Sequence, residues 1–497
     1  MYDLLVIGAG PAGLAASERA VRLGAKVCLL EARRVGGTDA VSGVVPARTL
    51  AQIAHLKRTA DELRRFGIEV GTPTLDFGRA LERCRGVIEE IHAATTAQAE
   101  ALGGADRLTV LEAAGAARFV APQSVLLGDG RVLTADKAVI CVGGHPRRPD
   151  FPGCELALLP HDLWRPGAVL PSTAVVLGTG HTGIQLASIL ADFGCKVQLL
   201  ERGPRILSHE DRDLSRAIHA GFEERGIEIV TGVAGAKAIE RDNGKLRFRC
   251  AVGEAEHSFR CEAVVVSQGW VPNTAALGLD AAGVALDRRG FVAVDDCLRS
   301  SQPSIYAAGD VTGRRMLVTA AMQEGYIAAG NALTGAEAPL RHRIVSSGGY
   351  PCPEHGSVGL TEAEARQRHE VEVAMAPYSE NHRAIIDGKT EGFCKLIVER
   401  QSRLILGAHV VGERAVEVVQ LAAAGMTSGL RVEQLAATDL AYPTYVQIVG
   451  EAAYRACLAL GIDIRETMPP DVPALWPSAE QIERQETPLP EGAPCSL

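Results

Sequence analysis

Residues 4–31 read LLVIGAGPAGLAASERAVRLGAKVCLLE, and residues 174–201 read AVVLGTGHTGIQLASILADFGCKVQLLE. The two stretches align without a gap at an offset of 170 residues. In each, a short apolar run leads into a G-x-G-x-x-G turn, an amphipathic segment follows, and a second apolar run ends on an acid. This order predicts a strand, a turn, a helix and a second strand in both copies. The chain therefore contains an internal repeat of the βαβ type, and its fold class is α/β.

The glycines of the two turns have distinct physical roles. The first permits a tight turn, the second lets the backbone approach a pyrophosphate, and the third lets helix and strand pack closely. The helix N-terminus offers free N–H groups to the phosphates, and the acid after the second strand accepts from ribose hydroxyls. The residues expected in these roles are Gly8, Gly10, Gly13 and Glu31 in the first copy and Gly178, Gly180, Gly183 and Glu201 in the second. Two such units predict two dinucleotides, which suggests FAD together with NAD(H) or NADP(H).

The composition limits the class of protein. A chain of 497 residues has room for roughly two to four domains. Its net charge of −9 argues against nucleic acid or an anionic membrane as a partner. The twelve cysteines form no C-x-x-C pair, so we expect no metal site. No apolar run approaches the ~20 residues that span a bilayer. A strand begins at Asp3 and leaves no room for a signal peptide, so we expect a cytoplasmic protein.

Residues 36–46, GGTDAVSGVVP, carry a resemblance to a known family. They resemble the redox-disulfide segment of the flavin-dependent disulfide reductases, the pyridine nucleotide-disulfide oxidoreductase family that includes dihydrolipoamide dehydrogenase and glutathione reductase. That segment has one cysteine after Gly-Gly-Thr and a second before Val-Pro. Asp39 and Val44 stand at these two positions, and they cannot form a disulfide. The resemblance implies that Gly37 and Thr38 contact FAD.

Three further segments extend the resemblance. Residues 138–149 and 264–274 are similar to the turns that follow the family's two nucleotide units, and residues 304–310 are similar to its second FAD signature. The resemblance places FAD at the first repeat and the nicotinamide nucleotide at the second. It also implies that Asp310 hydrogen-bonds the flavin ribityl chain. The cofactor-binding residues that it adds are Gly143, Gly269 and Asp310.

The resemblance extends to about residue 465 and implies the order of the domains. We expect two doubly wound Rossmann-like dinucleotide-binding domains plus a C-terminal α+β dimerisation domain. The expected ranges are 1–149 and 276–345 for the FAD-binding domain, 150–275 for the NAD(P)-binding domain, 346–465 for the dimerisation domain and 466–497 for a proline-rich tail. The protein is then a homodimer in which both active sites are built at the interface.

The second half of the family's electron path is missing from the sequence. The family reduces disulfides with its two cysteines and with a His-Glu pair, which the partner subunit donates from a His-Pro-Thr-x-x-Glu segment. Here that segment is residues 442–447, and Tyr442 and Gln447 stand at the two positions. A tyrosine, whose ordinary pKa is near 10, is a poor proton shuttle at neutral pH. Soluble pyridine nucleotide transhydrogenase, which lacks the complete disulfide and has a tyrosine here, is similar in part.

Four further positions bear on the flavin. Arg48 and Gln185 stand where the family has a lysine near flavin N5 and its glutamate partner. An Asp39–Arg48 ion pair is our hypothesis for balancing the cation, and the alternative for Asp39 is an acid in the first turn of a helix, worth roughly 0.3–1 kcal/mol. His181 takes the place of a tyrosine that gates the nicotinamide pocket. It either stacks on the flavin or transfers a proton, or it is a turn residue with no chemical role.

These residues predict an FAD-dependent NAD(P)H oxidoreductase. Hydride passes from nicotinamide to flavin, and electrons then pass directly to a small-molecule acceptor such as a quinone, a nucleotide, dioxygen or a small organic molecule. We expect the acceptor in the cavity that the disulfide would have filled. Glu201 favours NAD(H), while Arg202 and Arg205 keep NADP(H) open. The candidate catalytic residues are Asp39, Arg48, His181 and Tyr442.

Two other functions stay open. One is a non-catalytic sensor or partner subunit that binds flavin and NAD(H). Two intact nucleotide turns speak against it, because a scaffold has no need of the second. The other is a thiol or metal reductase that uses Cys495 in the C-terminal tail.

Overall fold

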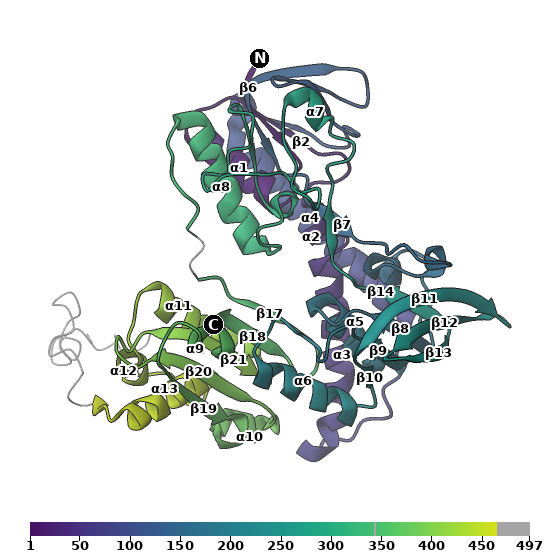
Figure 1. The fold of residues 1–497 in the computed structure, drawn as a ribbon, viewed down its shortest axis with the longest axis vertical. Coiled ribbons are helices and arrows are strands. Elements are labelled where there is room, and N and C mark those ends of the chain that lie inside the picture. Colours follow the sequence, from purple (N-terminus) through teal and green to yellow (C-terminus); the bar gives the residue numbers. More distant parts are fainter. Residues whose placement is uncertain (342–343, 465–497) are drawn as a thin grey trace, which may run out of the picture.

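The computed structural model describes residues 1–341 and 344–464, apart from the side chains of residues 103–106. Figure 1 shows three units of mixed α/β structure. The N-terminal repeat lies in the unit at the top of the view, the second repeat in the unit at the lower right, and the C-terminal sheet in the unit at the lower left. The fold class is therefore the expected one. The tail from residue 466 onward, with Cys495, lies outside the described residues.

The first unit is built around a sheet whose central strands are parallel. The strand order is β3-β2-β1-β6-β5-β4, and β16 pairs with β6. Side chains alternate along β1, so that Leu4 and Val6 pack into one core while Leu5 and Ile7 pack into another on the opposite face. The bounds are β1 (Tyr2–Ile7), β2 (Val27–Leu30), β3 (Leu108–Leu111), β4 (Arg118–Ala121), β5 (Ser124–Leu126), β6 (Val132–Ile140) and β16 (Ile305–Ala307). Helices α1 (Pro11–Arg22) and α8 (Val318–Thr334) pack side by side on one face (Figure 1).

The second unit repeats the plan of the first. Helix α5 (His181–Asp192) begins and ends at the positions that correspond to the ends of α1, so the predicted repeat is confirmed at the level of secondary structure. A parallel sheet in the order β10-β9-β8-β14 carries it, and an antiparallel sheet β11-β12-β13 stands beside it. The bounds are β8 (Thr173–Leu177), β9 (Lys196–Leu200), α6 (Arg212–Glu224), β10 (Glu228–Val230), β11 (Val233–Asp242), β12 (Lys245–Val252), β13 (Ala255–Cys261) and β14 (Ala263–Val266).

The third unit is a five-stranded antiparallel sheet in the order β17-β18-β21-β20-β19. Helices α11 and α13 contribute to its core. The bounds are β17 (Ser347–Gly349), β18 (His355–Gly359), α9 (Glu362–Arg366), β19 (Val371–Pro377), α10 (His382–Asp387), β20 (Phe393–Glu399), β21 (Ile405–Val411), α11 (Ala415–Thr427), α12 (Val432–Ala436) and α13 (Gln447–Leu460).

Three helices and two short strands join the first unit to the second. The helices are α2 (Gly37–Val41), α3 (Val44–Glu62) and α4 (Phe77–Arg107), and the strands β7 (Gly144–Pro146) and β15 (Trp270–Pro272) pair antiparallel. In Figure 1, α3 runs from the first unit down to α5. Leu50 and Ala54 of α3 share one hydrophobic core with Ile184 of α5, which fixes the two helices against each other. Within the described residues, no helix is long and apolar enough to span a membrane.

Candidate functional site

The two glycine turns have the same backbone geometry. Gly8 and Gly178 adopt positive φ angles of 104° and 99°, a region that L side chains rarely enter. A Cβ atom on Gly13 would lie 1.8 Å from the carbonyl oxygen of Gly8, and one on Gly183 would lie 1.9 Å from that of Gly178. Helix and strand therefore approach each other as closely as the sequence predicts. Both turns are built in the form that binds a dinucleotide.

The helix N-termini at these turns are open to a phosphate. Gly10 and Gly180 are the N-cap residues of α1 and α5, and no side chain caps either helix. A Cβ on Gly37 would come within 2.8 Å of the Cα atom of Gly10, so backbone meets backbone across the first turn. A Cβ on Gly180 would meet nothing within 4 Å. Such a cradle, with unpaired N–H groups at a helix N-terminus, fits a pyrophosphate.

The acids that end the second strands are held in matching places. The two carboxylate oxygens of Glu31 accept from the N–H groups of Ala9 and Arg33, each at 2.9 Å. Glu201 accepts from the N–H group of Gly203 at 2.6 Å and from the hydroxyl of Thr179. Each carboxylate is thus anchored to its own turn, at the edge where the fingerprint places the ribose.

Asp310 lies in the first unit, between strand β16 and helix α8. The carboxylate of this described residue accepts no hydrogen bond from the described protein atoms, and burial, followed by the charge of Asp39, raises its pKa to about 6. A half-buried acid that accepts no hydrogen bond from the described residues fits the hydroxyls of a ribityl chain. Gly143 and Gly269 have positive φ angles of 63° and 93° and stand next to the paired strands β7 and β15. The residues present therefore fit FAD at the first turn and a second dinucleotide at the other.

Arg48 of α3 contacts residues of the second and third units. Its Nη1 atom donates to Oε1 of Gln185 at 2.6 Å, so the predicted Arg–Gln contact is present. Its guanidinium carbon lies 3.4 Å from the ring centroid of Tyr350. Burial lowers the pKa of Arg48 to about 10, with Tyr350, Glu354 and Asp39 acting in the opposite direction. Arg48 is therefore a cation at neutral pH, clamped between an amide and an aromatic ring.

The hypothesis of an Asp39–Arg48 ion pair is wrong for this structure. No N–O distance of 4.0 Å or less joins these two described residues, because the guanidinium is turned toward Gln185 and Tyr350 instead. Asp39 lies in the first turn of α2, as in the alternative interpretation. Burial raises its pKa, and the more distant charge of Arg48 opposes that shift. Val44 is 44% exposed at the start of α3.

His181, the first residue of α5, is part of a polar cluster that the sequence did not reveal. Its ring stacks on that of His355, with centroids 5.2 Å apart and planes 11° apart. Its Nδ1 lies 3.1 Å from Nε2 of His355, and its Nε2 lies 3.2 Å from Oε1 of Glu210. The hydroxyl of Ser357 donates to the other oxygen of Glu210 at 2.5 Å, and Nδ1 of His409 lies 3.3 Å from that hydroxyl. His181 is thus held from two sides.

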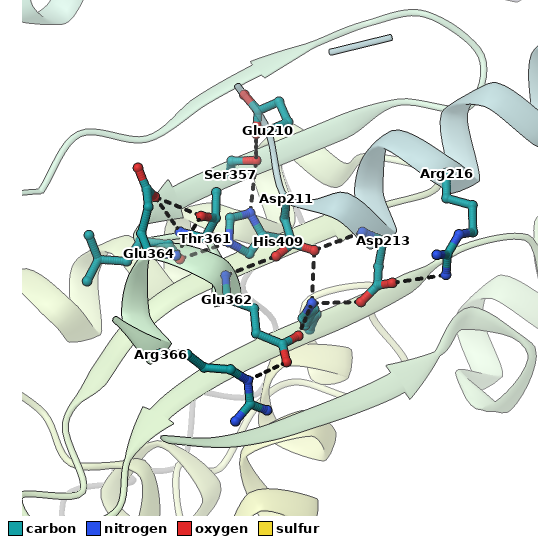
Figure 2. A network of polar contacts seen from close by, with 12 residues as sticks. Glu210, Asp211, Asp213, Arg216, Ser357, Thr361, Glu362, Glu364, Arg366 and His409 are labelled. Carbon is teal, nitrogen blue, oxygen red and sulfur yellow. Dashed lines mark hydrogen bonds and ion pairs between the residues drawn. The ribbon is translucent and has the colours of Figure 1, made fainter. Parts of the chain in front are cut away.

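A buried ion cluster fixes the loop that carries Glu210. The ammonium group of Lys395 lies 2.9 Å from Asp211, 2.7 Å from Asp213 and 2.7 Å from Glu362. Figure 2 shows these three carboxylates converging between α6 and the five-stranded sheet, with Glu210 above Ser357 in the same network. The cluster docks the second unit on the third. It therefore also determines where Glu210 meets His181.

Tyr442 lies apart from this cluster, on the surface of the third unit. Its side chain is 68% exposed, and its hydroxyl is hydrogen-bonded to Nδ1 of His382. Gln447 accepts from the N–H group of Thr444 at 3.1 Å at the start of α13. Gln447 therefore stabilises the local backbone, and the tyrosine ring is presented outward.

Sequence reasoning missed His355, Glu210 and Tyr350. They come from β18, from the loop before α6 and from the loop after β17, so no local spacing connects them. One signal was available, because His355 is a polar residue at the start of a short run that reads as a buried strand. Among the described residues, no group of three or more histidine, cysteine, aspartate or glutamate side chains could hold a metal ion.

Comparisons with known proteins agree with this geometry. Residues 2–325 match the family model of pyridine nucleotide-disulphide oxidoreductases, and residues 345–453 match the model of that family's dimerisation domain. The chain is 31% identical over 467 residues to dihydrolipoyl dehydrogenase from Geobacillus stearothermophilus, which covers 93% of this chain and 97% of the relative. It is 32% identical over 460 residues to glutathione reductase from Nostoc sp., covering 89% and 97%.

Two further comparisons are with a mercuric reductase and with a solved flavoprotein structure. The chain is 30% identical over 448 residues to mercuric reductase from Staphylococcus aureus, which covers 90% of this chain and 81% of the relative. Its fold is similar to that of the HOCl-induced flavoprotein disulfide reductase RclA from Escherichia coli, with a TM-score of 0.80 and 24% identity over 91% of this chain and 99% of the other. The likeness to RclA supports the fold alone.

Proposed function

The chain belongs to the pyridine nucleotide-disulphide oxidoreductase family, and on this premise we propose that it is an FAD-dependent NAD(P)H oxidoreductase that works without a redox disulfide. Electrons pass from the nicotinamide nucleotide to the flavin and then directly to a small-molecule acceptor. Candidate acceptors are a quinone, another nucleotide, dioxygen or a small organic molecule. The named relatives are disulfide or mercuric reductases, so the choice of acceptor is the new part of the proposal.

The observation that carries the proposal is the contrast between two parts of one site. Both glycine turns have the close helix–strand approach of a dinucleotide-binding turn, and the Arg48–Gln185 hydrogen bond ties α3 to α5, the helix that follows the second turn. In contrast, Asp39 and Val44 occupy the segment where the family has its cysteines. Neither side chain can be oxidised to a disulfide. A chain that keeps both nucleotide sites and lacks the thiol relay supports electron transfer from flavin to acceptor without that relay.

In this proposal the residues of the chain bind and orient the two cofactors. FAD and the nicotinamide nucleotide, when bound, supply the two-electron transfer. The N–H groups at the start of α1 and α5 hold the pyrophosphates, and Glu31 and Glu201 accept from the riboses. Asp310 hydrogen-bonds the ribityl chain, and Arg48 keeps a positive charge at the junction of the two sites.

NAD(H) is the nucleotide that the second turn favours. The carboxylate of Glu201 would repel a 2′-phosphate and accept from a 2′-hydroxyl. The guanidinium of Arg205 donates to three backbone carbonyls, those of Leu207, Ser208 and Glu210, at 3.0, 2.6 and 2.9 Å. Arg205 is therefore committed to its own loop. Of the two arginines that the sequence suggested, Arg202 is exposed and is the one left to contact a 2′-phosphate.

We place Tyr442 in the site of a second subunit. The chain carries the family's dimerisation domain, and Tyr442 extends from that domain into solvent in the single chain. In a homodimer it would stand where the family's partner subunit supplies its histidine. Its ring, hydrogen-bonded to His382, would then lie beside the space that the disulfide would have filled.

Anaerobic mixing with NADH in a stopped-flow instrument tests the proposal. Loss of the oxidised flavin absorbance within the dead time or within seconds is expected, followed by recovery on addition of a quinone, dioxygen or another acceptor. A parallel screen with oxidised glutathione, lipoamide and Hg²⁺ should give no turnover. Turnover with a disulfide at a rate that matches or exceeds that with every other acceptor would refute the proposal.

The same experiment separates the two other functions. A non-catalytic sensor would bind NADH without bleaching of the flavin. A reductase that uses Cys495 would lose its activity when the tail from residue 466 onward is removed. We expect full flavin reduction and full acceptor turnover in the truncated protein, since both nucleotide turns and Arg48 lie within residues 4–201, far from the tail in sequence.

A further inference from the structure

The reduction of an oxygen-bearing acceptor sets a requirement for a proton. For a quinone Q, the balance is NAD(P)H + H⁺ + Q → NAD(P)⁺ + QH₂. Two electrons and one proton come from the nicotinamide carbon as hydride, and one further proton must come from a group of the protein or from water. The family's donor for such steps would be the histidine whose place Tyr442 takes. The site therefore needs another group that holds and releases a proton near neutral pH.

The segment 36–46 supplies one ionisable group, Asp39. Its carboxylate makes no hydrogen bond or ion pair with another described residue that would fix its orientation. A single acid without an orienting partner is a poor proton donor by geometry. The expectation that the acceptor binds against this segment is therefore not favoured by the arrangement of the polar groups.

The second nucleotide turn presents a better arrangement. His181 follows Gly180 directly, and 45% of its side chain is exposed to solvent. Its Nε2 faces Glu210, whose side chain is 11% exposed and is itself held by the hydroxyl of Ser357. An imidazole whose second nitrogen is fixed by a buried carboxylate is the arrangement that stabilises an imidazolium and orients it for transfer.

We propose that His181, oriented by Glu210, gives the second proton to a quinone-like acceptor, which therefore binds on the nicotinamide side of the site after NAD(P)⁺ has left. The inference rests on the proposed function and names the class and the place of its acceptor. The proton leaves from Nδ1 of the His181 imidazolium, the atom that faces His355 when no acceptor is present. His181 becomes a neutral imidazole whose Nε2–H still donates to Glu210, and the quinone oxygen becomes a hydroxyl.

The surroundings of His181 keep the proton available to the site. His355 from β18 is 0% exposed, and burial, with His181 and Arg48 adding to the effect, lowers its pKa to about 3. His355 therefore does not take the proton into the interior. Burial alone would raise the pKa of Glu210, but hydrogen bonds from His181 and Ser357 lower it to about 2. Glu210 thus stays anionic beside Nε2 of His181.

The hydrogen bonds beyond Glu210 have defined donors and acceptors. Nε2 of His409 donates to the carbonyl of Leu360 at 3.0 Å, and Ser357 donates to Glu210. Lys395 and its three carboxylates lock the adjoining loop to the sheet (Figure 2). Glu210 and Ser357 are positioning residues in this scheme. The half-exposed ring of His181 regains its proton from solvent.

Stopped-flow measurement of the two half-reactions tests the proposal. We expect His181→Gln to keep its reduction by NADH and to slow reoxidation by menadione by about 100-fold, the lower end of the usual effect of a general acid. Reoxidation by ferricyanide, a one-electron acceptor that takes no proton, should change far less. The matched control is His219→Gln, which removes a surface imidazole that pairs with Glu223 on α6. That control should match the parent protein with both acceptors.

Ser357→Ala tests whether the orientation of Glu210 affects the proton transfer. It leaves His181 in place but releases one oxygen of Glu210, and we expect a shift in the pH profile of menadione reoxidation without a change in that of reduction by NADH. Equal slowing with menadione and ferricyanide in His181→Gln would overturn the proposal. So would a loss of the proton-dependent step in Asp39→Asn rather than in His181→Gln.

The shared site is tested without turnover. Dicoumarol, a redox-inert quinone mimic, should raise the apparent Kd of NAD⁺ for the oxidised holoenzyme in proportion to its concentration. A ternary complex with an unchanged NAD⁺ affinity would place the acceptor elsewhere and overturn the inference. If NADH does not bleach the flavin of the wild-type protein, or if no quinone reoxidises it, the proposed function has failed. If the wild-type protein completes this cycle and His181→Gln completes it at the same rate, only the role of His181 has failed.

Discussion

Replacement of Lys395 by methionine should destabilise the protein by about 3–5 kcal/mol, the usual cost of removing one partner from a buried ion pair. Lys395 and Asp211 are each 1% exposed at their side chains, and the ammonium contacts three carboxylates at 2.7–2.9 Å. In Lys395→Met, the carboxylates of Asp211, Asp213 and Glu362 face one another without the ammonium group between them, and the buried Asp211 loses its cation. The docking of the second unit on the five-stranded sheet then loses its central contact.

The effect should depend on pH in a defined direction. In the parent protein, burial alone would raise the pKa of Asp211, but the hydrogen bond from Lys395 and the other neighbours lower it. A carboxyl group with a lowered pKa stabilises the fold above its unfolded pKa, and that contribution is lost as the pH falls through the folded pKa. Lys395→Met has already lost this contribution. The difference between the two proteins should therefore be largest near pH 7 and shrink as the pH falls below about 4.

Urea unfolding of the holoenzyme, followed by far-UV circular dichroism at pH 7 and pH 4, measures both quantities. The matched control is Arg400→Met, which breaks the pair of Arg400 and Glu372 at the sheet surface, where the arginine side chain is 50% exposed. The control should cost at most about 1 kcal/mol. If Lys395→Met costs no more than Arg400→Met, or if its deficit grows toward acid pH, the reasoning about the buried cluster is refuted.

Three further predictions concern the nucleotide sites and the histidine cluster. Gly183→Ala places a methyl group 1.9 Å from the carbonyl of Gly178, so NADH should bind at least about tenfold more weakly in a fluorescence titration while the flavin content stays normal; unchanged affinity would contradict the assigned turn. Arg48→Met removes the cation that we propose lies beside the flavin, and it should make the flavin midpoint potential more negative in spectroelectrochemistry; a more positive potential would speak against the placement of Arg48. His355 is buried, and its pKa is lowered to about 3. Below about pH 6.5 the imidazole therefore binds a proton in the unfolded protein but not in the folded protein, and the free energy of unfolding should fall as the pH drops from about 6.5 toward 3. His355→Phe should flatten that slope in acid unfolding curves, and an identical slope would show that another group causes it.

The fold could be predicted from the sequence to the extent that its signals are local. The repeat at residues 4–31 and 174–201 placed two strands and a helix in each unit, because strand, turn and helix follow one another without interruption. The contact between Arg48 and Gln185 followed from the resemblance, since both positions belong to recognisable motifs. Such contacts between units are accessible when each partner lies in a motif of its own.

The remaining part of the site depends on packing between units, which no local pattern encodes. Asp39 and Arg48 are close in sequence, yet the guanidinium turns to Tyr350, 302 positions further along the chain than Arg48. Glu210 reaches His181 from a loop that the Lys395 cluster helps to fix on the sheet. These contacts join segments that are far apart in the sequence and share no motif, so they are seen only in the folded arrangement of the three units.

The most direct test of the account is an anaerobic titration that counts the equivalents of NADH consumed per flavin. A redox-active disulfide is a two-electron couple, so a reductase of that type takes up about two equivalents, one for the flavin and one for the disulfide. With Asp39 and Val44 at the two positions, the account predicts about one equivalent for complete reduction. Uptake of about two equivalents, with the appearance of two new thiols, would contradict it.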